Sequence, residues 1–451
     1  MSKDIRIRKG FNLNLDGEAN KIFAEISPSK TFALKPDDFF GSTPKMLVKE
    51  GEKVKKGTPL FFSKNNPKIH FVSPVGGDVT AIVRGAKRKI LEVVVTASES
   101  QESIKHDIPS IDKIDINETK EILLKSGAWP FIIQRPYGTI ANPEDKPKAI
   151  FISAFSTAPL NVEYSFIIKN HIAQFQKGIQ VLNKLVPNCV NLVVDGNFSA
   201  LFEQISEVNL TKVTGLHPAG NVGVQIHHID PINAGEKVWV IRPEDVVNIG
   251  KLFTTGEFSA QRTVAIAGTS VKNPQYYKST IGSSIYSLLA KTQLEDEKPN
   301  RIINGDVLSG SATSIDGYLG YYNNLISIIP EGNDYRMFGW LPFVDNSIPS
   351  MSKTSLSWLF GKQKAKVNTN MNGEERALVV TGEMERVLPM DIYPMQLLKA
   401  ILIEDIERME ALGIYEVVPE DFALIDYSST SKIEAQEIIR QGIELMLKEE
   451  G

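Results

Sequence analysis

The sequence contains very little cysteine and no long apolar run. Cys189 is the only cysteine among 451 residues. The chain therefore has no internal disulfide, and it cannot hold an iron–sulfur cluster alone, since such a cluster needs about four thiolates. No stretch approaches the roughly 18 apolar residues of a membrane-spanning helix. The N-terminus also lacks the apolar segment of a secretory signal. We therefore expect a soluble protein of the cytoplasm.

The sequence also lacks an excess of positive charge and the common catalytic motifs. The formal net charge is −4, which argues against nucleic acid as the main partner. No G-x-S-x-G, P-loop, H-E-x-x-H or C-x-x-C motif is present. We therefore assign no catalytic residue and no metal ligand. A hydrophobic content of 42% and a charged content of 23% are ordinary for a globular protein.

The segment 49–89 has the pattern of a small β domain. Residues 60–62 form an apolar strand, 73–77 a turn, and Val79, Ala81 and Val83 alternate as in a half-buried strand. This pattern is typical of a barrel-sandwich hybrid domain, the fold that carries lipoyl or biotinyl lysines.

The lysine at the tip of this domain has unusual neighbours for a carrier. The candidate is Lys68, which follows Pro67. Carrier lysines are normally flanked by small, acidic or methionine residues, and proline stiffens the backbone. We expect no covalent cofactor on Lys68, and a carrier of acyl or carboxyl groups stays as an alternative function.

The central part alternates strands and helices. We predict strands at 148–154 and 191–195 and helices at 164–185 and 200–205. This β-α-β-α order predicts a Rossmann-like domain with a parallel sheet. The turn at 153–159 has no glycine, so the dinucleotide fingerprint is missing.

The sequence predicts an α/β multidomain protein with five parts. They are a barrel-sandwich hybrid at 1–100, a connector helix and Rossmann-like domain at 101–256, a β-grasp domain at 257–345, a linker or hairpin at 346–375 and a helical C-terminal domain at 376–451. The connector helix is expected to begin at a cap provided by Asn117 and to end at Gly127.

The linker contains an apolar cluster formed by Leu356, Trp358, Leu359 and Phe360, with lysines on both sides. Aromatic residues beside lysines suit a membrane interface or a groove on a partner. A hairpin that packs on its own domain explains the cluster equally well.

Three of the six histidines lie close together in residues 215–228. Zinc needs three or four ligands in a workable geometry. His227 and His228 are adjacent in a predicted strand, where their side chains would point to opposite faces, so we predict no metal site. Gly220 and Gly223 lie between His217 and this pair of histidines, and without side chains they could let a ring or a partner's backbone approach closely.

Several segments together resemble the A subunits of the sodium-translocating NADH:quinone oxidoreductases. The resemblance runs from about residue 7 to the C-terminus. The segments that carry it are GFNLNLDGEA, SKNNPKIHFVSPVGGDVTAIVRGAKR, SGAWPFIIQRPY, GLHPAGNVGVQIHHIDP, NIGKLFTTGEF and RTVAIAGTSVKNP. This family is also similar to the C subunit of the Rnf electron-transport complex and to the flavin-binding subunit of respiratory complex I. It implies a soluble-ligand-binding (SLBB-like) version of the β-grasp domain.

The resemblance implies a peripheral subunit on the cytoplasmic face of the bacterial inner membrane. Its partners would be the B to F subunits, chiefly the membrane-embedded B subunit. NADH and flavins would be used by the whole complex, which reduces quinone and exports sodium. This chain would act at the quinone-reduction step or in assembly.

Two departures from the relatives limit the cofactors. The segment 126–131 keeps only Gly127 of the flavin loop, so we expect no FAD, and 426–432 contains no cluster-binding cysteine. Quinone is the remaining candidate ligand. Its candidate contacts are His217, Gly220, Gly223, His228 and Phe253. A soluble electron-transfer protein that binds flavin or quinone is the alternative.

Overall fold

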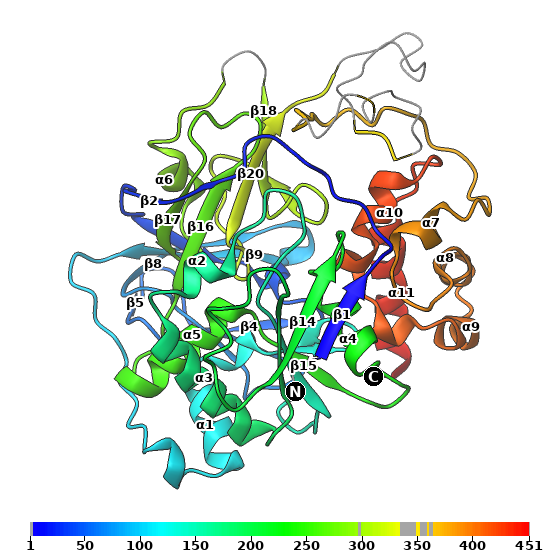
Figure 1. Cartoon of the computed structure of the whole chain (residues 1–451). Helices are drawn as coiled ribbons and strands as arrows, with labels where there is room; N and C mark the ends of the chain where they lie inside the picture. The colour runs from blue at the N-terminus through cyan, green and yellow to red at the C-terminus, as the bar shows by residue number, and fades with distance from the viewer. Residues whose placement is uncertain (1–2, 296–298, 334–348, 352–358, 360–363, 451) are drawn as a thin grey trace.

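The computed structural model describes residues 3–295, 299–333, 349–351, 359 and 364–450. Within this part of the chain, the strands form four sheets, two large and two small. The C-terminal helices, orange to red in Figure 1, gather on one side of the molecule.

The largest sheet of the described residues has seven strands. Their spatial order is β1 (Lys3–Ile7), β14 (Asn209–Gly215), β13 (Val190–Asp195), β12 (Ala149–Ser153), β15 (Val238–Val240), β10 (Ile133–Arg135) and β11 (Thr139–Ile140). The first five strands run parallel, and β10 and β11 are antiparallel additions at one edge. Nearly every residue of β12 and β13 is buried, as expected for a parallel sheet with both faces covered. The predicted parallel sheet is confirmed.

The helices of this domain differ in detail from the prediction. They are α1 (Ile116–Ser126), α2 (Tyr164–Ile168), α3 (Ile172–Leu185), α4 (Val222–Ile229) and α5 (Pro243–Thr255). Helix α1 ends at Gly127 as predicted, with φ of 77°. Its cap is Asp115 and not Asn117, because the Asp115 carboxylate accepts from the backbone N–H groups of Asn117 and Glu118, both at 2.8 Å.

Two further helix predictions for this domain were wrong. The single helix expected at 164–185 is divided into α2 and α3 by a turn, in which His171 N donates to the Ile168 carbonyl at 2.7 Å. Residues 200–205 form turns and not a helix. The backbone hydrogen bonds there are local turn bonds, from Phe202 N and Glu203 N to the Ser199 carbonyl and from Ile205 N to the Phe202 carbonyl.

Helices α3 and α5 cross with their backbones in contact. A Cβ atom on Gly178 of α3 would lie 2.2 Å from the Val246 carbonyl oxygen of α5. One on Gly250 of α5 would lie 1.8 Å from the Gln174 carbonyl oxygen of α3. No side chain fits at either position, so both glycines are required by helix packing.

The predicted barrel-sandwich region forms two small sheets of described residues. One contains β3 (Thr31–Leu34), β9 (Ile90–Ala97), β8 (Gly77–Arg84) and β5 (Lys53–Val54), and the other β4 (Pro44–Met46), β6 (Pro59–Ser63) and β7 (His70–Val72). The rings of Phe39, Phe61 and Phe71 pack together in the core, with the last two stacked at 4.7 Å. The strands predicted at 60–62 and around Val79 are confirmed.

The tip of this small domain contacts the parallel-sheet domain. Lys68 Nζ forms an ion pair with Glu144 at 2.7 Å, and Asn66 Nδ2 donates to Asn142 at 3.3 Å. A swinging arm would need a free tip, whereas this one is tethered by both contacts.

We expect the native chain to have the mass of its unmodified sequence. Attachment of lipoyl or biotinyl groups would convert the Lys68 amine to an amide and remove its ion pair with Glu144. Intact-mass measurement of the protein purified from its source decides the question. A lipoyl or biotinyl increment that disappears in Lys68→Arg would establish the carrier alternative.

The second large sheet has six strands in the described residues. Their order is β19 (Ser311–Thr313), β18 (Asn300–Asn304), β20 (Leu325–Pro330), β16 (Gln261–Ala267), β17 (Gln275–Thr280) and β2 (Asn20–Ala24). Strand β16 is antiparallel to β17 and parallel to β20. Helix α6 (Ile285–Leu289) packs on this sheet through a separate apolar core that includes Val264, Ile266 and Leu288.

The N-terminal segment belongs to both large sheets. Strand β1 pairs with β14 in the first, and β2 pairs with β17 in the second. Between them, Gly10 N donates to the Arg386 carbonyl and Phe11 N to the His217 carbonyl. We call residues 3–24 the N-terminal strap, because they connect three parts of the fold.

The C-terminal part is helical, as predicted. It contains α7 (Glu383–Val387), α8 (Pro394–Leu402), α9 (Ile406–Ala411), α10 (Ala423–Ser428) and α11 (Ala435–Glu450). The helix expected at 395–412 is two helices, since the chain turns at 403–405. Among the described helices, none is long and apolar enough to cross a membrane.

The apolar cluster of the linker can be placed at one residue only. Leu359 is exposed. Leu356, Trp358 and Phe360 lie outside the described residues. The role of this cluster as a membrane or partner contact stays a prediction.

Candidate functional site

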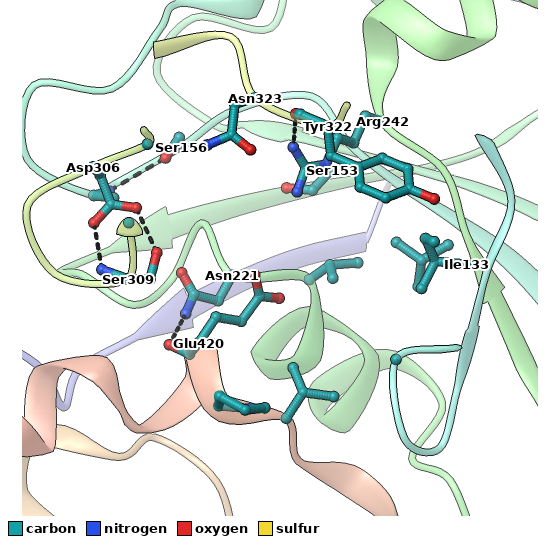
Figure 2. Close-up of a pocket in the computed structure, with 18 of the residues that line it drawn as sticks. Ile133, Ser153, Ser156, Asn221, Arg242, Asp306, Ser309, Tyr322, Asn323 and Glu420 are labelled. Carbon is teal, nitrogen blue, oxygen red and sulfur yellow. Dashed lines mark hydrogen bonds between the residues drawn. The ribbon is translucent and has the colours of Figure 1, made fainter. Parts of the chain in front are cut away.

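A cavity of about 510 Å³ lies at the carboxyl ends of strands β12 and β15 (Figure 2). Ligands of open parallel sheets bind at this edge, and the volume suits a small molecule. The wall combines four parts of the chain. It includes Asp38 and Phe40 of the small domain, Ser153, Ser156, His217, Asn221 and Arg242 of the parallel-sheet domain, Asp306, Tyr322 and Asn323 of the second large sheet, and Glu420 and Arg440 of the helical part.

His217 lines this cavity with one ring nitrogen unpaired. Its side chain is buried, and within the described residues its Nε2 has no hydrogen-bond partner. Its Nδ1 lies 3.1 Å from Thr157 Oγ1, which already accepts from Gly220 N at 2.9 Å. A threonine hydroxyl has one donor and two acceptor sites, so it can donate to Nδ1 while it accepts from Gly220 N, and in that arrangement the imidazole proton lies on Nε2.

The ring of His217 is neutral at physiological pH. Burial lowers the pKa of His217 to about 4, against smaller opposing effects of Asp306 and Asp421. With Thr157 donating to Nδ1, the ring presents an uncharged N–H donor to the cavity. Asn12 holds its backbone by accepting from His217 N at 2.8 Å.

A buried ion-pair cluster forms the floor beneath the cavity. Arg135 of β10 contacts Glu420 at 2.7 Å and Asp421 at 2.8 Å. The Arg135 side chain is 4% exposed and that of Asp421 is 0% exposed. Asn221 Nδ2 donates to the Glu420 carbonyl at 3.0 Å, as Figure 2 shows. These contacts hold the helical part against the parallel-sheet domain.

Gly220 and Gly223 of the histidine segment face the chain's own atoms. A Cβ on Gly220 would lie 2.5 Å from Thr157 N. One on Gly223 would lie 2.5 Å from Asp421 Oδ2 and 2.6 Å from Arg135 Nη1. The close approach expected from the sequence is present, and its partners belong to this molecule.

The prediction that His227 and His228 lie on a strand was wrong. They lie on α4, because residues 222–229 complete helical hydrogen bonds. His227 Nδ1 lies 2.7 Å from Glu416, and its Nε2 accepts from Asp391 N at 2.9 Å. His228 Nε2 lies 2.8 Å from the Pro389 carbonyl oxygen. Both rings thus attach α4 to the helical part.

Of the five candidate contacts for quinone, His217 and Gly220 line the cavity. Gly223 and His228 lie at the boundary with the helical part. Phe253 is buried in the apolar core on α5. Among the described residues, no group of three or more His, Cys, Asp or Glu side chains is arranged to hold a metal.

Several polar residues of the cavity wall were not predicted from the sequence. Arg242 follows β15 and donates to the Tyr322 carbonyl, and its guanidinium lies 5.4 Å from the Tyr322 ring centroid. Asp306 accepts from the backbone N–H groups of Leu308 at 2.8 Å and Ser309 at 3.0 Å. The run from Val238 to Pro243 carries the signal of a strand followed by a proline at a helix start, which would have located Arg242.

Comparisons with known proteins agree on one family. Three family models match: the NqrA N-terminal barrel-sandwich hybrid domain at residues 5–98, the NqrA second alpha/beta domain at 114–258 and the NQRA C-terminal domain at 263–314. The predicted barrel-sandwich fold and the α/β second domain are thereby confirmed.

Relatives match over nearly the full length of the chain. The chain is 36% identical to the A subunit of the Na(+)-translocating NADH-quinone reductase of Haemophilus influenzae, over 99% of this chain and 100% of the relative. It is 35% identical to the corresponding protein of Neisseria gonorrhoeae, with the same coverage. A crystal structure of an NAD+-reducing [NiFe]-hydrogenase aligns with 76% of this chain and 62% of its own, at 10% identity and a TM-score of 0.36.

Proposed function

The chain belongs to the NqrA family, the A subunits of the Na+-translocating NADH-quinone reductases, and we propose that its cavity contacts the quinone headgroup during quinone reduction. The proposal assigns binding and positioning to this chain. Electron transfer through flavins belongs to other subunits of the complex.

The observation that carries the proposal is the buried Nε2 of His217, which has no hydrogen-bond partner among the described residues and is a donor when Thr157 donates to Nδ1. A quinone presents two carbonyl oxygens, which accept hydrogen bonds and carry no positive charge. A buried donor without a partner costs about 1–3 kcal/mol, and a carbonyl oxygen in the cavity relieves that cost. The depressed pKa of His217 keeps this donor neutral, so the site favours a neutral acceptor over a carboxylate.

The placement of the chain in the complex is part of the proposal. We propose that it lies peripherally on the cytoplasmic face of the membrane and contacts the B to F subunits, chiefly the membrane-embedded B subunit. The subunit name of the full-length relatives supports an assembly of this kind. We also propose a Rossmann-like class for the second domain, a β-grasp class for the third, and the relation to the Rnf and complex I subunits.

We expect His217→Leu to raise the quinone KM of Na+-stimulated NADH:quinone reduction about twofold to tenfold. Loss of one hydrogen bond costs about 0.5–1.5 kcal/mol, which sets this range. His217→Gln places an amide N–H near the position of Nε2 and should keep most of the affinity. The measurement uses membranes from cells that lack the native chain and express each variant.

Two controls separate quinone binding from assembly. His70→Gln changes a histidine of β7 in the small domain, away from the cavity lining, and should leave the KM unchanged. NADH oxidation with an artificial acceptor should persist in every variant. An unchanged quinone KM in assembled His217→Leu complex would place the quinone contact elsewhere. Poor recovery of that complex from membranes would favour the assembly role.

A further inference from the structure

Three charged side chains are buried together where the second and third domains meet. Glu244 and Asp245 lie in the first turn of α5, and Arg262 lies in β16. Asp245 and Arg262 are 0% exposed, and Glu244 is 4% exposed. Arg262 Nη2 lies 2.9 Å from Asp245 Oδ1, and its Nη1 lies 3.7 Å from Glu244 Oε2.

The charges of this cluster do not balance if both carboxyl groups are ionised. Two carboxylates and one guanidinium would leave a net negative charge, and an uncompensated buried charge is very costly. A carboxyl group in this position keeps its proton instead. Several polar atoms of the cluster lack hydrogen-bond partners within the described residues, among them Glu244 Oε2.

Two further cations act on the cluster from a distance, Lys251 on Glu244 and Arg242 on Asp245, but neither forms an ion pair with it in the described residues. Arg242 is exposed and donates to the Tyr322 carbonyl. Lys251, further along α5, donates to the Gln261 side chain. Tyr164 and Tyr321 are the neighbouring phenols, and burial raises the pKa of each, so both are neutral.

The geometry distinguishes the two carboxyl groups. Asp245 is the closer partner of Arg262 and forms the ion pair. Glu244 Oε1 accepts a hydrogen bond from Thr263 N at 2.7 Å, a role that the carbonyl oxygen of a carboxylic acid can fill. The proton of the acid would then lie on Oε2. We propose that Glu244 is a proton-binding site, whose side chain is a neutral carboxylic acid beside the Asp245–Arg262 ion pair.

Burial raises the pKa of both carboxyl groups, and the closer ion pair with Arg262 opposes this for Asp245. Burial raises the pKa of Glu244 to about 7, against the smaller lowering effects of Arg262 and Thr263. Its proton is therefore held below that pH and released above it. A carboxyl group that titrates near neutral pH can exchange protons under physiological conditions.

The site lies directly behind the cavity wall. Arg242 and Pro243 precede Glu244 in the chain and line the cavity, as do Tyr164 and Asn324. A ligand that gains negative charge in the cavity would increase proton occupancy of Glu244, because a nearby negative charge favours the neutral acid. This coupling rests on the proposed quinone contact, whereas the bound proton does not.

Infrared spectroscopy of the full chain tests the bound proton. We expect the C=O stretching band of a carboxylic acid, lost as the pH rises through about 7. The band should be absent in Glu244→Gln. It should shift when glutamate carboxyl groups carry ¹³C and stay in place when aspartate carboxyl groups do. A band that persists in Glu244→Gln, follows the aspartate label, or is absent in the wild type overturns the proposal.

Two variants control for other sources of the band. Glu92 is a second glutamate whose pKa burial raises, and Glu92→Gln should keep the band that titrates near 7. His217→Leu should also keep this band, so loss of quinone affinity and loss of the proton site are measured separately.

The rate of quinone reduction in membranes tests the coupling. We expect this rate to change with pH near 7 in the wild type and in Glu92→Gln, and to lose that change in Glu244→Gln. An unchanged profile overturns the coupling.

Stability against pH gives an independent measurement. The folded pKa of Glu244 lies above its ordinary value of 4.5, so the folded state binds the proton more tightly. The stabilisation is complete below pH 4.5 and is lost as the pH rises to about 7. Urea midpoints of the wild type should fall relative to those of Glu244→Gln across this window. A constant difference between the two overturns the proposal.

Discussion

Replacing Gly250 by alanine is expected to destabilise the folded chain by about 3 kcal/mol, the upper part of the usual range for an overpacked site. The new Cβ would lie 1.8 Å from the Gln174 carbonyl oxygen of α3, far inside van der Waals contact. Backbone atoms cannot rotate away, so α3 and α5 must separate and lose packing along their length. Alanine otherwise favours a helix interior by about 1 kcal/mol over glycine, so the sign of the effect identifies the clash.

The urea midpoint followed by tryptophan fluorescence measures this effect. Trp129 and Trp239 are buried against each other in the parallel-sheet domain, with ring centroids 5.5 Å apart, and report on its unfolding. Gly85→Ala is the control, because its Cβ would contact only the flexible side chain of Leu91. A stable Gly250→Ala protein would mean that the two helices do not touch at this point.

Replacing Arg135 by methionine is expected to destabilise the chain by about 3–5 kcal/mol. The substitution removes the cation and leaves the carboxylate of Asp421 buried without its ion-pair partner. It also removes the contact with Glu420, so the helical part should loosen from the floor of the cavity. Increased hydrogen exchange in residues 414–428 would report this loosening directly.

Two further variants distinguish the buried pair from a general charge effect. Lys125→Met removes an exposed ion pair with Glu121 and should change stability by less than about 0.5 kcal/mol. Adding Asp421→Asn to Arg135→Met removes the buried charge that the single variant leaves behind, so the double variant should be more stable than the single one. A double variant no more stable than the single one would show that packing, and not charge, sets the cost.

Local patterns predicted the elements whose burial is periodic or complete. The apolar run at 149–153 indicates a strand that is buried on both faces. The alternation around Val79 indicates a strand that is buried on one face. Details that depend on a distant segment were not accessible. The cap of α1 was a local miss, since Asp115 and Glu118 form a capping box that the sequence contains. The histidines of α4 were placed on a strand because apolar and polar residues alternate there, and their partners Glu416 and Pro389 lie far along the chain.

The candidate site was predicted only in part for the same reason. His217 and Gly220 stood out because a histidine and glycines occur in one unusual segment. Arg242, Asp306 and Asn323 come from loops far apart in the chain, and only the folded arrangement brings them to one cavity. The resemblance to a family identified the complex. The hydrogen bonds of His217 could not be predicted from the sequence, because their partners are brought together only by the fold.

The N-terminal strap places an unusual demand on synthesis of the chain. Lys3 pairs with Thr211, and Phe23 pairs with Tyr276. The first strands to leave the ribosome therefore wait for partners made much later, with unpaired backbone groups that other chains could capture. Pairing at these two sheet edges is consequently a late event: a nascent chain cut before residue 209 would have both strands unpaired, and one cut between 216 and 274 would still have β2 unpaired.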